Sequence, residues 1–142
     1  MPMFKTWFFL NGIVLISSKN YCQNTAIPDP NFEQALIDLG YDTPPIDNLV
    51  PTNNISGRIE LDVKGKNIQD LTGIEDFSAL KKLDCSENFL TNIDVSLLSN
   101  LQILWCYGNQ ITNLNVDQNI ALTALRCENN ELSSLNLSNN IN

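Results

Sequence analysis

The sequence predicts an α/β solenoid in which short parallel strands stack into a single sheet. Three observations predict this fold: positions 80–142 repeat with a period of 21, each repeat contains a short alternation of apolar and polar residues, and an asparagine follows each alternation at the same place. One such unit cannot bury its apolar side alone, so successive coils have to stack around a shared core.

The repeat consists of seven matching columns. Three rows of equal length begin at Leu80, Leu101 and Leu122, and each reads Leu-x-x-Leu-x-Cys-x-x-Asn-x-Leu/Ile. This pattern and this period are typical of leucine-rich repeats. The other six columns are Leu83, Leu104 and Leu125; Cys85, Cys106 and Cys127; Asn88, Asn109 and Asn130; Leu90, Ile111 and Leu132; Ile93, Leu114 and Leu135; and Val95, Val116 and Leu137.

A fourth, less regular coil precedes these rows, which places about four coils in residues 55–142. The spacing from Leu61 of this coil to Leu83 of the next is one position longer than the later period, and Lys66 replaces the column asparagine. Its apolar columns are Leu61, Val63, Ile68 and Leu71.

The alternating segment of each coil is the predicted strand, since one face of it is apolar. Neighbouring strands should lie roughly 4.8 Å apart in a parallel sheet on the concave face, with irregular or 3-10 structure on the convex side. The expected strands are residues 59–63, 82–86, 103–107 and 124–128.

Two columns are polar or reactive, and we interpret both as structural. The asparagines follow the strands, where their amides can bond to the backbone of adjacent turns. The three column cysteines should be buried free thiols, because side chains stacked in register give poor disulfide dihedrals. A metal site is disfavoured, since the chain has no Cys-x-x-Cys and no histidine.

Residues 1–22 are predicted to be a signal peptide. Lys5 supplies a positive start, and the run from Trp7 to Ile16 is apolar apart from Asn11 and Gly12, which is too short for a membrane-spanning helix. We expect cleavage near Cys22 or Gln23. A buried N-terminal strand or helix is the alternative.

Residues 23–54 are expected to form an N-terminal helical cap. Asp29 can cap a helix that has Pro30 at its first position, and Gly40 can end it. Three prolines then predict irregular chain. Asp42 and Asp47 lack the pattern of a calcium loop, so we expect a solvated loop there.

Composition excludes several classes of function. The chain carries 16 acidic and 8 basic residues, so it is a poor partner for nucleic acid or an anionic membrane surface. No histidine is available as a base and no hydrolase motif appears, so we expect neither an enzyme nor a cofactor or metal. A non-catalytic binding protein remains.

The outward side chains of the predicted strands should form rows across the sheet, and we expect partners to bind there. Aromatic side chains and arginine are favoured at binding hot spots. Cross-strand packing is the alternative role. The rows are Asp62, Asp84, Trp105 and Arg126; Lys64, Ser86, Tyr107 and Glu128; and Glu60, Lys82, Ile103 and Ala124. The predicted ligand-binding residues are Asp62, Asp84, Trp105, Tyr107, Arg126 and Glu128.

Nearly the whole mature sequence resembles secreted leucine-rich-repeat proteins of the flavobacterial type. The resemblance rests on IPDPNFEQALIDLGYD and on ISGRIELDVKGKNIQDLTGIEDFSALKKLDCSENFLTNIDVS. It implies a secreted or cell-surface protein that binds another protein or mediates adhesion. Family members are usually larger and often carry a C-terminal sorting domain.

Two alternative functions follow from the same features. The chain could be a truncated structural fragment of a larger secreted repeat protein, or a glycan-binding targeting module of a secreted enzyme. We also expect the last coil, from residue 122 onward, to fray or to associate end to end with another chain, since solenoids need polar caps.

Overall fold

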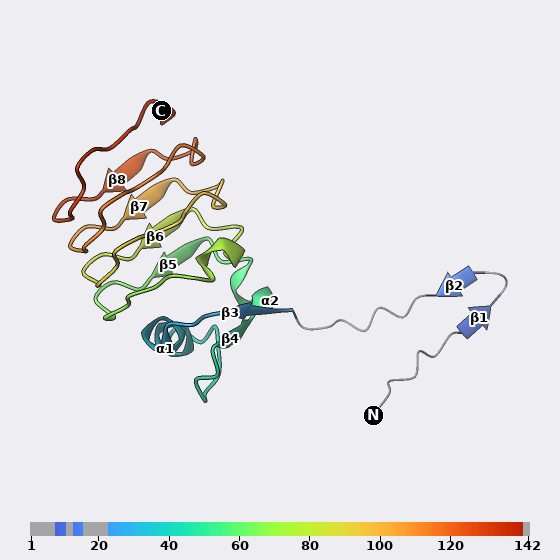
Figure 1. Cartoon of the computed structure of the whole chain (residues 1–142). Helices are drawn as coiled ribbons and strands as arrows, with labels where there is room; N and C mark the ends of the chain where they lie inside the picture. The colour runs from blue at the N-terminus through green and yellow to red at the C-terminus, as the bar shows by residue number, and fades with distance from the viewer. Residues whose placement is uncertain (1–7, 11–12, 16–22, 141–142) are drawn as a thin grey trace.

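The computed structural model describes residues 8–10, 13–15 and 23–140, and Figure 1 shows a stack of coils that follows an N-terminal segment. The predicted signal peptide and its cleavage site lie largely outside these residues. Within it the structure describes two short antiparallel strands, β1 (Phe8–Leu10) and β2 (Ile13–Leu15). In the described part of the chain, no helix has the length and apolar character needed to cross a bilayer.

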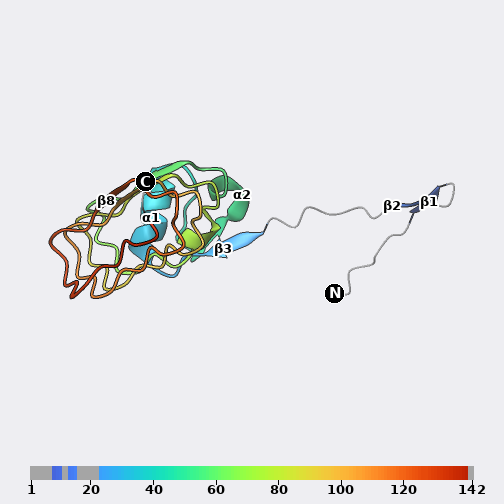
Figure 2. The ribbon, with the colours of Figure 1, turned by 90° about the horizontal axis from the view of Figure 1, so that it is seen from above.

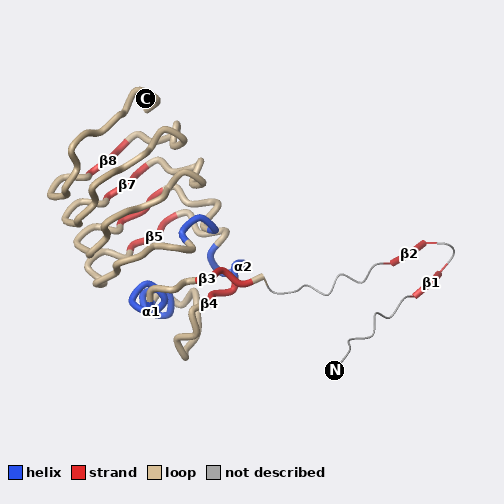
Figure 3. Tube along the Cα trace, viewed as in Figure 1, coloured by secondary structure: helices blue, strands red, loops and turns tan. Residues whose placement is uncertain are grey.

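The coils share one parallel sheet. Its strands are β5 (Glu60–Asp62), β6 (Lys82–Asp84), β7 (Ile103–Trp105) and β8 (Ala124–Arg126), in that order. Most of each coil is loop (Figure 3), and the coils overlie one another when the stack is viewed from its end (Figure 2).

Each strand is shorter than the alternation predicts. Pairing between coils nevertheless continues past the strand ends, since the N–H of Cys85 donates to the carbonyl of Trp105 and that of Glu87 to Tyr107, both at 2.9 Å. The strands end early because the chain turns or bends within three residues of the end of each of them.

The predicted apolar columns form the core. Leu83, Leu104, Cys85 and Cys106 are fully buried, as expected. The last coil differs, because Cys127 is only half-buried, which corrects the prediction of three buried thiols. Leu125, Leu132 and Leu135 are also partly exposed, and Leu137 is 44% exposed.

The asparagine ladder has the structural role that the sequence predicts. The Asn109 side chain accepts a hydrogen bond from the N–H of Leu90 at 3.0 Å and donates to the carbonyls of Cys85 and Cys106 at 3.1 and 3.0 Å. Each amide therefore joins two coils and satisfies backbone groups that the turn would otherwise bury unpaired. Asn88 and Asn130 make equivalent contacts.

A second asparagine pair lies on the other side of the core, and we did not predict it. Asn119 is fully buried and donates to the carbonyls of Val95 and Leu98 at 2.8 and 2.9 Å. Asn140 repeats this arrangement one coil later. The signal is hard to recognise in the sequence, because the same column holds Leu98 in the preceding coil.

The N-terminal segment contains the predicted helix and additional structure. Helix α1 (Pro30–Asp38) begins after Asp29, whose carboxylate accepts the N–H groups of Asn31 and Phe32. It ends before Gly40, which has a φ of 73°. The expected irregular chain instead holds β4 (Leu49–Pro51), which pairs antiparallel with β3 (Asn24–Ala26), followed by α2 (Thr52–Ile55).

This segment packs against the first coil. The second carboxylate oxygen of Asp29 accepts the N–H groups of Gln69 and Asp70 at 2.7 and 2.9 Å. The rings of Phe32 and Phe77 stack with centroids 6.5 Å apart. Asp29 therefore both caps α1 and fixes it to the first coil, which Figure 1 shows beside it.

The extra residue of the longer first coil lies between Leu71 and Ile74. Gly73 has a φ of 99° there and precedes the 3-10 helix η1 (Ile74–Asp76). A β-carbon at Gly73 would lie 2.4 Å from Cδ1 of Ile27. The insertion thus makes room for the N-terminal segment to approach the coil.

Candidate interaction surface

The predicted rows exist on the face of the sheet that points away from the core, called here the sheet face. Strand register aligns Asp62 with Asp84, Asp84 with Trp105 and Trp105 with Arg126. The row of Glu60, Lys82, Ile103 and Ala124 is aligned in the same way. The strand register therefore confirms the predicted alignment of these two rows.

The sheet face is not uniformly open, which corrects one expectation. Asp84 is only 6% exposed and Ser86 is fully buried, although both were expected to face solvent. The Asp84 carboxylate accepts hydrogen bonds from the N–H and hydroxyl of Ser86. Asp62, one strand earlier, is exposed and accepts the N–H of Lys64 at 3.1 Å.

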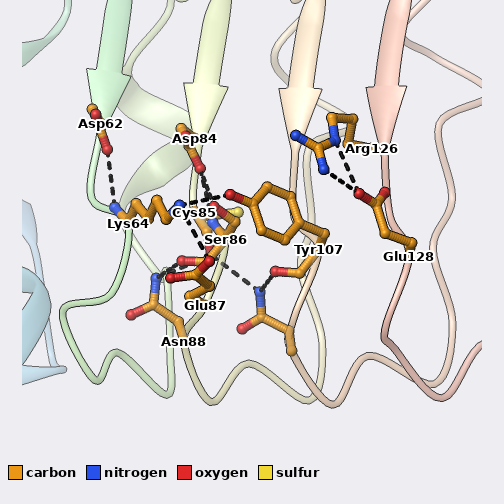
Figure 4. A network of polar contacts seen from close by, with 11 residues as sticks. Asp62, Lys64, Asp84, Cys85, Ser86, Glu87, Asn88, Tyr107, Arg126 and Glu128 are labelled. Carbon is orange, nitrogen blue, oxygen red and sulfur yellow. Dashed lines mark hydrogen bonds and ion pairs between the residues drawn. The ribbon is translucent and has the colours of Figure 1, made fainter.

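Tyr107 lies at the centre of a cluster that spans all four coils (Figure 4). Its hydroxyl accepts a hydrogen bond from Nζ of Lys64, two coils earlier, at 2.7 Å. The guanidinium carbon of Arg126, one coil later, is 4.4 Å from the ring centroid. The ring is therefore held between two cations and lies across the strands.

This contact changes the titration of both partners. The hydrogen bond from Lys64 is the largest cause that lowers the pKa of Tyr107. The same hydrogen bond and the carboxylate of Glu87 raise the pKa of Lys64. Lys64 therefore stays charged at neutral pH, and water and salt weaken both effects because the two groups are partly exposed.

The cations of the sheet face are paired with carboxylates. Nζ of Lys64 is 3.2 Å from Glu87, and Nζ of Lys82 is 3.8 Å from Glu60. Nζ of Lys82 is also 5.1 Å from the centroid of the Trp105 ring. Arg126 pairs with Glu128 through its guanidinium. Exposed pairs of this kind contribute little to stability, so a ligand could exchange with them at low cost.

The six predicted ligand-binding residues thus share one face, but they do not form one contact set. Arg126 contacts both Tyr107 and Glu128. Asp62 and Asp84 instead accept hydrogen bonds from the residues two positions after them in the chain. The sequence prediction of ligand-binding residues missed Lys64, Lys82 and Glu87. The first two occupy predicted outward positions, so row alignment could have found them.

The stacked thiols offer no nucleophile at neutral pH. Burial raises the pKa of Cys106 to about 12 and that of Cys85 well above the ordinary range. Burial also raises the pKa of Cys127. All three therefore stay protonated and behave as apolar core groups.

Comparisons with known proteins agree with the fold. Residues 78–118 match the family model described as "Leucine Rich repeats (2 copies)". Among solved structures, one similar protein is the functional domain of InlJ from Listeria monocytogenes, which includes a cysteine ladder. It is 32% identical with a TM-score of 0.74, and the match covers 83% of this chain and 27% of that chain. An internalin, InlF, from the same organism is 23% identical with a TM-score of 0.69, over 78% and 33%. No curated protein matches the chain.

These likenesses support a bacterial leucine-rich-repeat protein with a solenoid fold. The chain spans about a third or less of the length of either solved structure.

Proposed function

We propose that the chain is an extracytoplasmic protein-interaction module that binds its partner through the sheet face. One observation supports this most directly: Tyr107 is half-buried between Lys64 and Arg126, and half-buried Trp105 lies two residues earlier, at the end of β7. Aromatic rings of limited mobility, surrounded by exchangeable charges, are typical of binding hot spots.

The size of the surface sets a limit on the partner. Four strands span about 14 Å across the sheet at roughly 4.8 Å per spacing. A standard interface needs about 800 Å² on each side. A partner would therefore have to cover most of the sheet face, including Asp62, Asp84, Arg126 and Glu128, so a folded protein surface or a long extended segment fits better than a small molecule.

Photocrosslinking tests this proposal. In one variant, benzoylphenylalanine replaces Trp105. In the control variant it replaces Phe89, an exposed aromatic residue outside the sheet. Surface and secreted proteins of the bacterium that encodes the chain are then irradiated with each variant. We expect a product from position 105 and none from position 89.

Competition decides whether that product reports the sheet face. Excess unlabelled wild-type chain should abolish it, whereas the Trp105→Ala/Tyr107→Ala double variant should not compete. The melting temperature of the double variant should stay close to that of the wild type. Equal competition by the two chains, or a large loss of stability with binding retained, would favour cross-strand packing as the role of the rings.

We also propose that residues 1–22 are an export signal and that residues 23–54 cap the first coil. The fixing of α1 by Asp29 and the Phe32–Phe77 contact support the cap. N-terminal sequencing of secreted material should begin near Gln23. An intact Met1 on cytoplasmic protein would contradict the export proposal.

A further inference from the structure

A groove with a volume of about 550 Å³ lies on the side of the solenoid, between the first two coils. It is formed by the chain that follows the turn after β5 and after β6, from Gln69 to Glu75 and from Thr91 to Leu97. None of the predicted ligand-binding residues of the sheet face lines it. It is therefore a second surface, separate from the one proposed above.

The floor of the groove is apolar, and its rim carries an unusual leucine. Leu71 and Ile93 are nearly buried, with 4% and 5% exposure, whereas Leu97 is 68% exposed. The following coils place Gln118 and Asn139 in the position of Leu97. A large exposed apolar side chain therefore occurs in this column only beside the groove.

The charge of the groove has one sign. Asp70, Glu75 and Asp94 line it, and no lysine or arginine does. The sequence has no lysine or arginine between Lys66 and Lys81 or between Lys82 and Arg126. On the sheet face, by contrast, the cations are paired with carboxylates.

All three of these carboxylates accept a backbone N–H, and Asp70 accepts that of Thr72 at 2.8 Å. Glu75 accepts the N–H of Gly73 at 2.8 Å, and Asp94 accepts the N–H of Ser96 at 2.9 Å. Glu75 and Asp94 each use one oxygen for this contact and have a second to offer a cation. Hydrogen bonds from the side chain and the backbone of Ser96 also lower the pKa of Asp94, which favours its charged form.

We propose that this groove binds a basic segment of a partner protein that carries apolar residues beside its lysine or arginine. The basic side chain pairs with Glu75 and Asp94, and the apolar side chain covers Leu71, Ile93 and Leu97. Charge complementarity selects this occupant, because an acidic second copy of the chain or an anionic ligand would be repelled. Volumes of this size accommodate a few side chains.

Peptide binding to the full chain tests the assignment. The probes are fluorescein-labelled Arg-Leu-Arg-Leu-Arg, its serine analogue Arg-Ser-Arg-Ser-Arg and its acidic analogue Glu-Leu-Glu-Leu-Glu, followed by fluorescence anisotropy. We expect the first to bind most tightly, the serine analogue more weakly and the acidic one not at all. The replacement Asp94→Asn or Leu97→Gln should raise the Kd of the first peptide about threefold or more.

Two control variants separate this site from non-specific attraction and from the sheet face. Asp117→Asn removes the same charge one coil later, outside the groove, and should change binding less than twofold. The Trp105→Ala/Tyr107→Ala variant should bind the peptide like wild type, so failure of one proposal does not entail failure of the other.

Three outcomes would overturn the proposal. Equal weakening by Asp117→Asn and Asp94→Asn would show attraction to the whole acidic chain. Equal affinity for the leucine and serine peptides would remove the apolar floor from the site. A concentration-dependent dimer in sedimentation velocity that Leu97→Gln dissolves would assign the groove to a second copy of the chain.

Discussion

The contact at Gly73 joins the N-terminal segment to the solenoid, and replacing this glycine should weaken the protein measurably. A β-carbon there would lie 2.4 Å from Cδ1 of Ile27 and 2.6 Å from the carbonyl oxygen of Ala26. Non-bonded carbons do not approach this closely, so the strand before α1 would have to move. The φ of 99° also disfavours alanine.

The matched variant is Gly65→Ala, because Gly65 has a φ of 64° and nothing within 4 Å of its β-carbon position. It isolates the backbone cost, which is about 1–2 kcal/mol for a non-glycine residue in the left-handed region. Overpacking adds about 1–3 kcal/mol. We therefore expect Gly73→Ala to lose about 2–5 kcal/mol of unfolding free energy and Gly65→Ala about 1–2 kcal/mol.

Urea unfolding followed by circular dichroism measures both losses, with the slope showing whether the folded state stays compact. The variant Ile27→Val removes the Cδ1 atom, so Gly73→Ala should cost less in that background than in the wild type. Equal losses for Gly73→Ala and Gly65→Ala would refute the close approach of the N-terminal segment and with it the proposed cap.

Two further predictions concern the core. Asn109→Ala should lower the unfolding free energy by about 3 kcal/mol or more, since several buried backbone groups lose their partners. The control is Asn113→Ala, at an exposed position of the same coil, which should change the unfolding free energy by less than about 0.5 kcal/mol. Similar losses would contradict the ladder. The second prediction rests on Cys106, whose pKa in the folded state is about 12. At a pH above the ordinary thiol pKa, the unfolded chain loses this proton while the folded chain keeps it. The unfolding free energy should therefore fall as pH rises from about 9 toward 12. Urea unfolding measured at several pH values should show that the unfolding free energy of Cys106→Ala falls less with pH. If its pH dependence equals that of the wild type, the buried thiol is not the cause.

The fold was predictable from the sequence because each coil is confined by its neighbours. An inward position stays inward at the same place in every coil, so columns such as Leu83, Leu104 and Leu125 identify the core without knowledge of distant contacts. The asparagine ladder follows the same logic, since an amide at that place serves the same backbone groups each time. The helix was predictable from local signals, Asp29 and Pro30 at its start and Gly40 after its end.

What the sequence did not predict depends on contacts without periodicity. The pairing of β3 with β4 joins segments separated by a helix and a proline-rich loop, and neither segment alternates apolar and polar residues in its sequence. The burial of Asp84 depends on contacts with its surroundings, including the hydroxyl of Ser86. The side groove arises where the longer first coil meets its shorter successor, and a repeat alignment treats that difference as a gap.

The distribution of charge connects the two proposed surfaces. Each of the three cations of the sheet face lies beside a carboxylate, so that face presents its aromatic rings among paired charges, with Asp62 and Asp84 as further carboxylates. The side groove has the opposite character, because Asp70, Glu75 and Asp94 share it without a cation. Binding at the sheet face should therefore depend mainly on Trp105 and Tyr107 and change little with salt, whereas binding at the groove should weaken steeply as salt screens its carboxylates. A partner that contacts both surfaces would consequently lose only part of its affinity in high salt, and the remaining part would be the contribution of the rings.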